Sequence, residues 1–348
     1  MKRLLLLVLV VVLAGAGWYG RQIYERVERP YRGYAGAEQF VDLPPGASTQ
    51  VIGRTLVDAG VVSDPLSFRI ALWQTGAARR LKAGEYRFDR PMTVREVIDK
   101  LARGEVYLRP ITFPEGLRIR EMAEIYEAHG FGTAESFRSA ASDASIIADL
   151  DPEAHDLEGY LFPETYDLPR HTTAAQLVRM AVARFKQVFG EDLRQQALAH
   201  GLNVHRAVTL ASLVEKETAR PEERPIVAAV YLNRLRIGMG LQSDPTVIYA
   251  LDRAGLYRGN LTRDNLRFDS PYNTYRYAGL PPAPIAAPGR SSLMAVAEPA
   301  DVGYLYFVSR NDGSHEFART LAEHNRNVYK YQVLYFRQKR FEGLRQRH

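Results

Sequence analysis

The feature that most constrains the fold is a strand and helix pattern between residues 38 and 178. An alternating segment at 40–43 is followed by a turn, two helical stripes and a second alternating segment at 83–88. Period-two alternation is typical of strands, and apolar spacing of three and four is typical of helices. A helix capped by Thr93 and ended by Gly104 follows. We therefore predict a small βααβ module with one more helix, in a chain of the α+β class.

The same pattern recurs in the next stretch of the sequence. A shift of 70 positions, later of 80, places residues of the first unit on residues of similar type. The matched pairs include Val41 and Ile111, Leu43 and Phe113, Gly46 and Gly116, Gly60 and Gly130, Tyr86 and Tyr166, and Thr93 and Thr173. The change of shift indicates an insertion of about ten residues between 138 and 166. Duplication of one module explains the matches, and so do the turns and helical spacing that any two βα units share.

The chain begins with two basic residues and an uncharged run from Leu4 to Tyr19. The run has the minimum length of a membrane-spanning helix, and Trp18 stands where an interfacial aromatic belt would lie. A signal peptide cleaved near 14–16 is the alternative. The leading positive charges orient the N-terminus towards the cytoplasm. We predict a cytoplasmic N-terminus at 1–3, an uncleaved transmembrane anchor at 4–20 and a juxtamembrane stalk at 21–37, with the rest of the chain outside the cytoplasm.

Composition excludes several classes of function. The 348 residues are 46% hydrophobic, enough for two folded cores. The 46 basic and 40 acidic residues are interspersed, so the net charge of +6 does not indicate nucleic-acid binding. We find neither a basic stripe with interleaved aromatics nor a glycine-rich phosphate loop. The lack of cysteine excludes thiol nucleophiles, disulfides and thiolate metal sites. We expect no nucleic-acid partner and no cofactor.

A later helix ends in two carboxylates. The stretch TLASLVEKET at 209–218 has apolar residues at helical spacing and places Glu215 and Glu217 in its last turn. The negative end of the helix dipole and an apolar neighbourhood both disfavour ionisation, so a carboxyl group there keeps its proton near neutral pH. A general acid requires that state. Two solvated glutamates at a helix end are the alternative, and spacing does not choose between Glu215 and Glu217.

The other chemistry-bearing residues leave acid-base catalysis as the main candidate. His315 and His324 do not have the spacing of a metal-binding pair, no Gly-x-Ser-x-Gly motif occurs, and no metal site is expected. A hydrolysing glycosidase uses two carboxylates, which Glu217 and Asp244 are able to supply. With one carboxylate, the group acts first as acid and then as base. The sugar then supplies its own nucleophile, as muramic acid does when its C6 hydroxyl closes on C1.

Two irregular stretches are aromatic and polar. LEGYLFPETY at 157–166 combines a glycine, a proline, rings and carboxylates, and SPYNTYRY at 270–277 precedes a stiff proline run. Rings stack on the apolar faces of sugars while carboxylates accept hydrogen bonds from hydroxyl groups. The first stretch therefore has the composition of a sugar-binding loop, with an aromatic strand pair in the core as the alternative. The second is a loop of fixed shape.

In this order, the motifs resemble those of the YceG-like (MltG) endolytic murein transglycosylases. The resemblance rests on ASLVEKETARPEERPIVAAVYLNRLRIGMGLQSDPTVIYAL at 211–251, with LEGYLFPETY upstream and SPYNTY, GLPPAPI and LAEHN downstream. It covers nearly everything after residue 38. It implies a LysM-like module at 38–107 and a catalytic domain at 108–348 with a lysozyme-like helical part. That family's single catalytic glutamate precedes a hydroxyl residue, which matches Glu217 and Thr218 here.

The resemblance also implies a reaction. Glu217 protonates the leaving oxygen of the MurNAc–GlcNAc β-1,4 bond inside a nascent peptidoglycan strand, then accepts the C6 hydroxyl proton, leaving a 1,6-anhydroMurNAc end and terminating elongation. The expected location is the inner membrane, single-pass, with the catalytic domain in the periplasm and peptidoglycan synthases as candidate partners. Candidates for the glycan-binding wall are Glu158, Tyr160, Glu164, Gln242, Asp244, Tyr272, Asn273 and Tyr275. Asp244 is also explained as a helix cap. A hydrolysing muramidase and a non-catalytic wall-binding scaffold are the alternatives.

Overall fold

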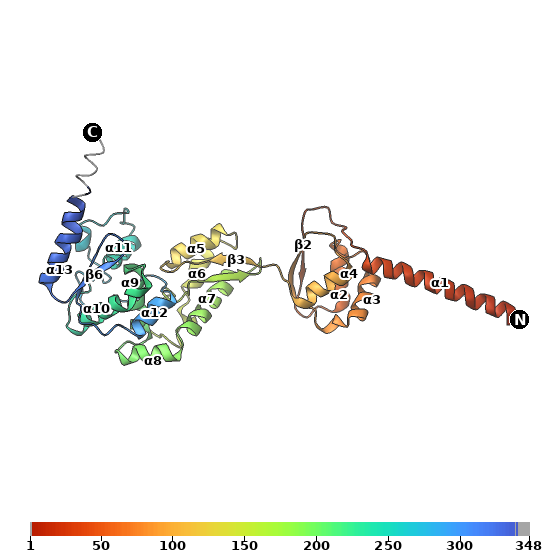
Figure 1. The fold of residues 1–348 in the computed structure, drawn as a ribbon, viewed down its shortest axis with the longest axis horizontal. Coiled ribbons are helices and arrows are strands. Elements are labelled where there is room, and N and C mark those ends of the chain that lie inside the picture. Colours follow the sequence, from red (N-terminus) through yellow and green to blue (C-terminus); the bar gives the residue numbers. More distant parts are fainter. Residues whose placement is uncertain (1, 338, 340–348) are drawn as a thin grey trace, which may run out of the picture. The chain divides into compact units, whose positions relative to one another are not determined.

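The computed structural model describes residues 2–337 and 339, which form two compact units (Figure 1). The first unit comprises residues up to 110 together with 167–171, and the second comprises 111–166 and the chain from 172 onwards. Helices and short two-stranded sheets occur in the described chain, so the predicted α+β class is confirmed. The LysM-like and lysozyme-like resemblances stay predictions.

The first unit contains the predicted βααβ module and its additional helix. Its elements are α1 (Lys2–Glu28), β1 (Gln39–Leu43), α2 (Thr49–Asp58), α3 (Pro65–Thr75), η1 (Ala77–Arg79), β2 (Gly84–Phe88) and α4 (Val94–Arg103). Strands β1 and β2 pair antiparallel, with Val41 opposite Tyr86. Val41 and Leu43 are buried while Asp42 between them is exposed, as the alternation predicts. These strands and the helices enclose one apolar core.

Part of the segment predicted as a stalk packs on this unit. Helix α1 continues to Glu28, and Val27 is only 1% exposed in the core. The Tyr31 N–H donates to the carbonyl of Met92 at 2.9 Å. No helix within the described residues has both the length and the apolar character that crossing a membrane requires. The anchor expected at 4–20 lies within α1 and stays a prediction.

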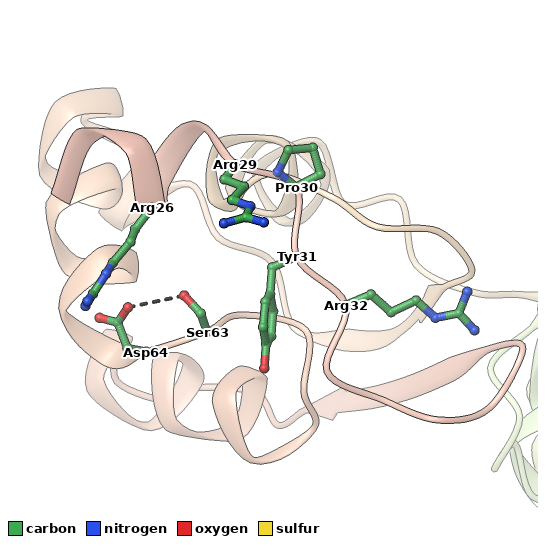
Figure 2. A pocket seen from close by; sticks show the side chains of 7 residues that line it. All are labelled: Arg26, Arg29, Pro30, Tyr31, Arg32, Ser63 and Asp64. Atoms are coloured by element: carbon green, nitrogen blue, oxygen red, sulfur yellow. Dashed lines mark hydrogen bonds between the residues drawn. The ribbon is translucent and has the colours of Figure 1, made fainter. Parts of the chain in front are cut away.

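A cavity of about 590 Å³ opens beside the end of α1 (Figure 2). Arg26, Arg29 and Arg32 give it a cationic lining. Asp64, which also lines the cavity, accepts hydrogen bonds from Ser63 Oγ at 3.2 Å and from the backbone N–H of Ser67 at 2.8 Å. Those bonds lower the pKa of Asp64, although burial opposes them. Asp64 therefore serves as the N-cap of α3.

The order of elements in the module recurs, as the shifted alignment predicts. The second series is β3 (Arg109–Thr112), α5 (Ile119–Ala128), α6 (Ala134–Ala141), η2 (Ala144–Ile146), β4 (Thr165–Leu168) and α7 (Ala174–Val188). Gly46 and Gly116 occupy equivalent turns with φ of +77° and +76°, a conformation that favours glycine. Tyr86 Oη donates to the carbonyl of Lys82 at 2.8 Å, and Tyr166 Oη donates to that of Phe162 at 2.7 Å. The two series thus share local contacts as well as element order.

Helices dominate the rest of the second unit. They are α8 (Glu191–Ala199), α9 (Val204–Glu217), η3 (Pro221–Glu223), α10 (Arg224–Arg236), α11 (Asp244–Arg253), η4 (Asn265–Arg267) and α12 (Arg290–Ala297), followed by the β5 (Tyr306–Ser309) and β6 (His315–Ala318) hairpin, α13 (Leu321–Val328) and a π-helical turn at Tyr329–Leu334. Every residue of α9 from Ala207 to Val214 is buried. Helices α8, α10, α11 and α12 pack against α9, which makes it the central helix of this unit.

Candidate active site

The buried helix α9 places two glutamates in its last turn, as the sequence predicts. Asn203 begins the helix, because its side-chain oxygen accepts a hydrogen bond from the Arg206 N–H at 2.9 Å. The helix ends after Glu217, where Thr218 adopts extended backbone angles. Residues two positions apart on a helix point to nearly opposite sides. Glu215 and Glu217 therefore enter different surroundings, and tertiary contacts distinguish them.

Glu215 forms a buried ion pair. Its Oε1 accepts a hydrogen bond from Arg224 Nη2 at 2.8 Å, and its Oε2 accepts one from the Gly289 N–H at 2.9 Å. The Glu215 and Arg224 side chains are only 5% and 6% exposed. Burial raises the pKa of Glu215, while the Gly289 N–H and the Arg224 charge oppose that shift. Both carboxylate oxygens are occupied, so Glu215 ties α9 to the first residue of α10 and to the residue before α12.

Glu217 lies in a different environment. Its Oε2 accepts hydrogen bonds from Tyr231 Oη on α10 at 2.8 Å and from Ser243 Oγ at 3.2 Å. Among the described residues, no hydrogen bond reaches its Oε1. Burial is the main cause that raises the pKa of Glu217, and the negative charge of Asp244 adds to it. The two hydroxyl groups and the charge of His315 oppose the rise. The geometry favours a protonated carboxyl group with one free oxygen.

The start of α11 completes the surroundings of Glu217. Ser243 is the N-cap residue, yet its hydroxyl makes no capping bond and donates to Glu217 instead. The preceding residue, Gln242, has φ of +50°, which is uncommon for a residue with a side chain. Its N–H donates to the carbonyl of Thr274 at 3.1 Å. Strained backbone of this kind is concentrated at functional sites, where surrounding contacts hold it.

Asp244 occupies the first turn of α11, so it lies beside the helix start without serving as the N-cap. Its side chain is exposed, and its Oδ1 accepts a hydrogen bond from Tyr275 Oη at 2.6 Å. The positive end of the α11 dipole stabilises a carboxylate at this position. Asp244 therefore adds a negative charge near Glu217 and connects α11 to the loop at 270–277.

That loop forms a wall alongside α11. Asn273 is fully buried, and its side-chain amide donates to the carbonyls of Leu266 and Phe268 at 3.0 and 2.7 Å. Its Oδ1 accepts the Tyr275 N–H, which fixes the turn that points Tyr275 at Asp244. The Tyr272 ring packs on the Tyr249 ring of α11 with centroids 4.9 Å apart. The structure thus brings together Gln242, Asp244, Tyr272, Asn273 and Tyr275, with Asn273 shaping the loop from inside.

The predicted loop at 157–164 is irregular, but it lies elsewhere in the second unit. Tyr160 is 1% exposed, packs edge-on against Phe185, and donates its hydroxyl to Asp151. Asp151 in turn bonds His205 in the first turn of α9, about 18 Å from Glu217 at the helical rise of 1.5 Å per residue. Glu164 pairs with Arg184 of α7 at 2.7 Å. The structure does not bring Tyr160 or Glu164 to Glu217, and their part in glycan binding stays a prediction.

Glu158 is also buried, and it faces a second cavity. Its Oε1 accepts the N–H of Ile119, the first residue of α5, at 3.0 Å. Burial raises its pKa to about 8, although that backbone hydrogen bond opposes the shift. Glu158 lines this cavity together with Tyr249 and Arg253 of α11. Glu158 therefore lies near the C-terminal end of α11, which is the end away from Glu217.

Sequence reasoning missed four residues around the acid. Tyr231 and Ser243 bond Glu217 directly, whereas Glu223 and His315 form a support behind it. Glu223 accepts the Thr218 hydroxyl at 3.1 Å and the His315 Nδ1 at 2.7 Å. These hydrogen bonds to His315 and Thr218 lower the pKa of Glu223. The sequence signals only a histidine in a predicted hairpin, and its spacing from His324 bears on metal binding alone.

Comparisons with known proteins identify the family of the chain. The model of the YceG-like family matches residues 41–330. A Bacillus subtilis (strain 168) protein named endolytic murein transglycosylase is 31% identical over 92% of this chain and 91% of its own length. A Streptococcus pneumoniae (strain D39) protein of the same name is 30% identical over 92% of this chain and 63% of its own length.

A solved structure shows the same similarity. The crystal structure of a yceG-like protein from Listeria monocytogenes has a TM-score of 0.57 and 30% sequence identity, and it covers 84% of this chain and 99% of its own. Glu217, its hydroxyl partners and the α11 wall all lie within the matched residues 41–330. The chain therefore belongs to the YceG-like family.

Proposed function

We propose that this protein is an endolytic lytic transglycosylase of peptidoglycan, with Glu217 as its catalytic acid and base. The relatives from Bacillus subtilis and Streptococcus pneumoniae carry the name endolytic murein transglycosylase. The observation that carries the proposal is the Glu217 carboxyl group, whose pKa is raised and whose Oε1 has no hydrogen-bond partner among the described residues. Its substrate is the MurNAc–GlcNAc β-1,4 bond of nascent strands.

One carboxyl group suffices for both steps. Protonated Glu217 donates its proton to the glycosidic oxygen as the bond from that oxygen to C1 of MurNAc breaks, which leaves positive charge at C1 and a hydroxyl on the departing sugar. The Glu217 carboxylate then takes the proton of the C6 hydroxyl while O6 bonds to C1. Tyr231 and Ser243 hold Oε2 in both states, so the carboxyl group keeps its orientation. The product ends in 1,6-anhydroMurNAc.

A hydrolysing muramidase is the second candidate, because Asp244 lies close enough to raise the pKa of Glu217. In that reaction Asp244 would act as the base for water or as the nucleophile. The hydrogen bond from Tyr275 and the exposed position of Asp244 are compatible with this role. Asp244→Asn separates the two candidates, since a muramidase loses its second carboxylate while a transglycosylase keeps its acid.

Product analysis tests the function. The full-length chain acts on uncrosslinked glycan strands, and mass spectrometry identifies the new ends. We expect 1,6-anhydroMurNAc ends, and Asp244→Asn retains strand cleavage. Reducing ends that carry added water, together with loss of cleavage in Asp244→Asn, would instead establish a muramidase. No cleavage under any condition would favour the non-catalytic scaffold.

The membrane location belongs to the same proposal. An anchor at 4–20 holds the catalytic unit on the outer side of the inner membrane, where strands emerge from the synthases, so cleavage there terminates their elongation. The uncharged run behind two basic residues supports this orientation. Carbonate extraction of membranes from cells expressing the full chain tests it. Release of the protein into the soluble fraction would contradict an anchor.

The neighbours of Glu217 should shift the pH dependence of cleavage in opposite directions. The general acid must be protonated, so activity is lost as pH rises through its pKa. Asp244→Asn removes a charge that raises this pKa, so the alkaline limb moves to lower pH. Ser243→Ala removes a hydrogen bond that lowers the pKa, so the limb moves to higher pH. The pH profile of kcat/KM measures both shifts. Asp264→Asn, at an exposed position, is the matched control and should leave the pH profile unchanged. If the alkaline limb moved in the same direction in Asp244→Asn and Ser243→Ala, Glu217 would not be the general acid that sets this limb.

A further inference from the structure

A cavity of about 330 Å³ lies at the far end of α11 from the catalytic acid. Asp244 stands at the first turn of α11 beside Glu217, whereas Asp252 and Arg253 stand at its last turn and line the cavity. The two ends are about 14 Å apart at 1.5 Å per residue. Tyr275 bonds Asp244, and Tyr272 packs on Tyr249. The loop at 270–277 thus contacts α11 at Asp244, near Glu217, and at Tyr249, which lines the cavity.

Arginine side chains gather around the cavity. Arg118, Arg120, Arg138 and Arg253 all line it. The opposing acids are Asp156, Asp252 and Glu158. The pKa of Glu158 is raised to about 8, so at neutral pH this group is mostly protonated and does not neutralise the arginines. Asp252 contacts both Arg118 and Arg120, at 2.7 and 3.3 Å, and Arg138 pairs with Glu135 at 2.6 Å. Protonated Glu158 is also able to donate a hydrogen bond to an incoming anion.

Two of these arginines have unused hydrogen-bonding capacity. Arg118 pairs with Asp252 at 2.7 Å, but its buried Nε has no hydrogen-bond partner in the described part of the chain, and its side chain is only 12% exposed. Arg253 forms no ion pair with any described residue, and within the described chain its side chain donates one hydrogen bond, to the Tyr249 hydroxyl at 3.3 Å. The guanidinium groups of Arg118 and Arg253 both lie over the Tyr249 ring, at 5.2 and 5.7 Å. Such stacking pre-orients a planar fork that matches a carboxylate.

The rest of the lining suits a short peptide. Ile119, Ala141 and Tyr249 supply apolar surface between the arginines. A site for inorganic anions has no need of such surface, whereas aliphatic side chains do. The strands that this family's relatives act on carry peptides with free carboxylates on their muramic acid residues. Helix α11 thus has the proposed acid near one end and, at the other, a cavity lined by arginine and apolar side chains.

We propose that this cavity is a subsite for a carboxylate of the peptide stem, held by Arg118 and Arg253 while the attached sugar lies along the α11 wall. The inference rests on the proposed function. It makes the enzyme selective for strands that still carry peptides and places a stem-bearing muramic acid at a fixed distance from Glu217. Strands from which amidases have removed the peptides are then poor substrates.

Substrate comparison in the full-length chain tests this subsite. The two substrates are uncrosslinked strands with peptide stems and the same strands after treatment with an amidase. We expect kcat/KM to be at least tenfold higher for the stem-bearing strands, and we expect Arg253→Gln to bring that ratio close to one. Arg179→Gln, an exposed arginine on α7, should keep the wild-type ratio. Equal rates on both substrates in the wild type, or an unchanged ratio in Arg253→Gln, would overturn the subsite while the transglycosylase stands.

A binding measurement separates the subsite from the catalytic proposal. The free stem tetrapeptide is titrated into the full-length Glu217→Gln variant by calorimetry, with the same peptide carrying amidated carboxylates as the control. We expect binding of the unmodified peptide only, weakened at least tenfold by adding Arg253→Gln. Equal binding of both peptides would overturn the carboxylate assignment. If the wild type cleaves no strand but the peptide binds as expected, the proposed reaction fails and the cavity remains a peptide-binding site.

Discussion

Replacing Glu217 with glutamine is expected to reduce strand cleavage by about 10²–10⁴-fold, the usual contribution of a general acid or base. Glutamine has nearly the same shape, and its carbonyl oxygen still accepts the hydrogen bonds of Tyr231 and Ser243. It cannot transfer a proton to the leaving oxygen or accept one from the C6 hydroxyl. Both half-reactions therefore fail together. Quantifying 1,6-anhydroMurNAc ends over time measures the loss.

The matched control is Glu222→Gln in η3, five residues away in sequence. Glu222 is exposed, with 67% of its side chain accessible, and its contact with Arg220 is long at 3.5 Å. We expect this variant to cleave strands at the wild-type rate. The circular dichroism spectra of both variants should match that of the wild type. If Glu217→Gln retained more than about a tenth of the activity, Glu217 would be no general acid.

The largest loss of stability is expected from Arg224→Met, at about 3–5 kcal/mol in the free energy of unfolding. Arg224 is buried and neutralises Glu215, so its removal leaves a buried carboxylate without a counter-charge. Glu115 loses its contact with Arg224 as well, at 3.3 Å. The free-energy cost of the unpaired charge on Glu215 then exceeds the stabilisation gained by burying the apolar methionine side chain. Urea unfolding at neutral pH, followed by circular dichroism, measures the change.

Arg236→Met on the exposed side of the same helix is the control. Its side chain bonds only Asn233 in the described contacts, at 3.0 Å, and we expect a change within about 0.5 kcal/mol. Glu215→Gln combined with Arg224→Met should recover part of the lost stability, because the unpaired charge is gone. Equal unfolding midpoints for Arg224→Met and the control would show that the ion pair contributes no net stability.

Local signals in the sequence predicted most of the fold. The strands at 39–43 and 84–88, the helix between Thr93 and Gly104 and the last turn of α9 follow from alternation, capping residues and helical spacing. Each of these signals acts within a few residues, so a single sequence displays it. The loop at 157–164 was recognised as irregular for the same reason. The burial of Tyr160 was not, because its partners Asp151 and Phe185 depend on the packing of other elements.

The candidate site was only partly accessible to such reasoning. Helical spacing placed Glu215 and Glu217 in one turn but gave no preference, and resemblance to a family supplied the choice. The structure adds a physical distinction: Arg224 engages Glu215, whereas two hydroxyl groups engage Glu217. Tyr231 and Ser243 lie 14 and 26 residues beyond Glu217, so no local pattern connects them with it.

The paired turns at Gly46 and Gly116 have the same backbone shape but different surroundings. A Cβ added at Gly46 would meet no atom within 4 Å, whereas one at Gly116 would meet Lys216 Cδ at 3.5 Å. Lys216, which stands between the two glutamates, donates to the Gly116 carbonyl at 3.0 Å. The same turn therefore has free space around it at Gly46 and supports a neighbouring helix at Gly116. Length changes should accumulate freely around Gly46 in related chains, while the turn at Gly116 stays constant because it supports the helix that carries the acid.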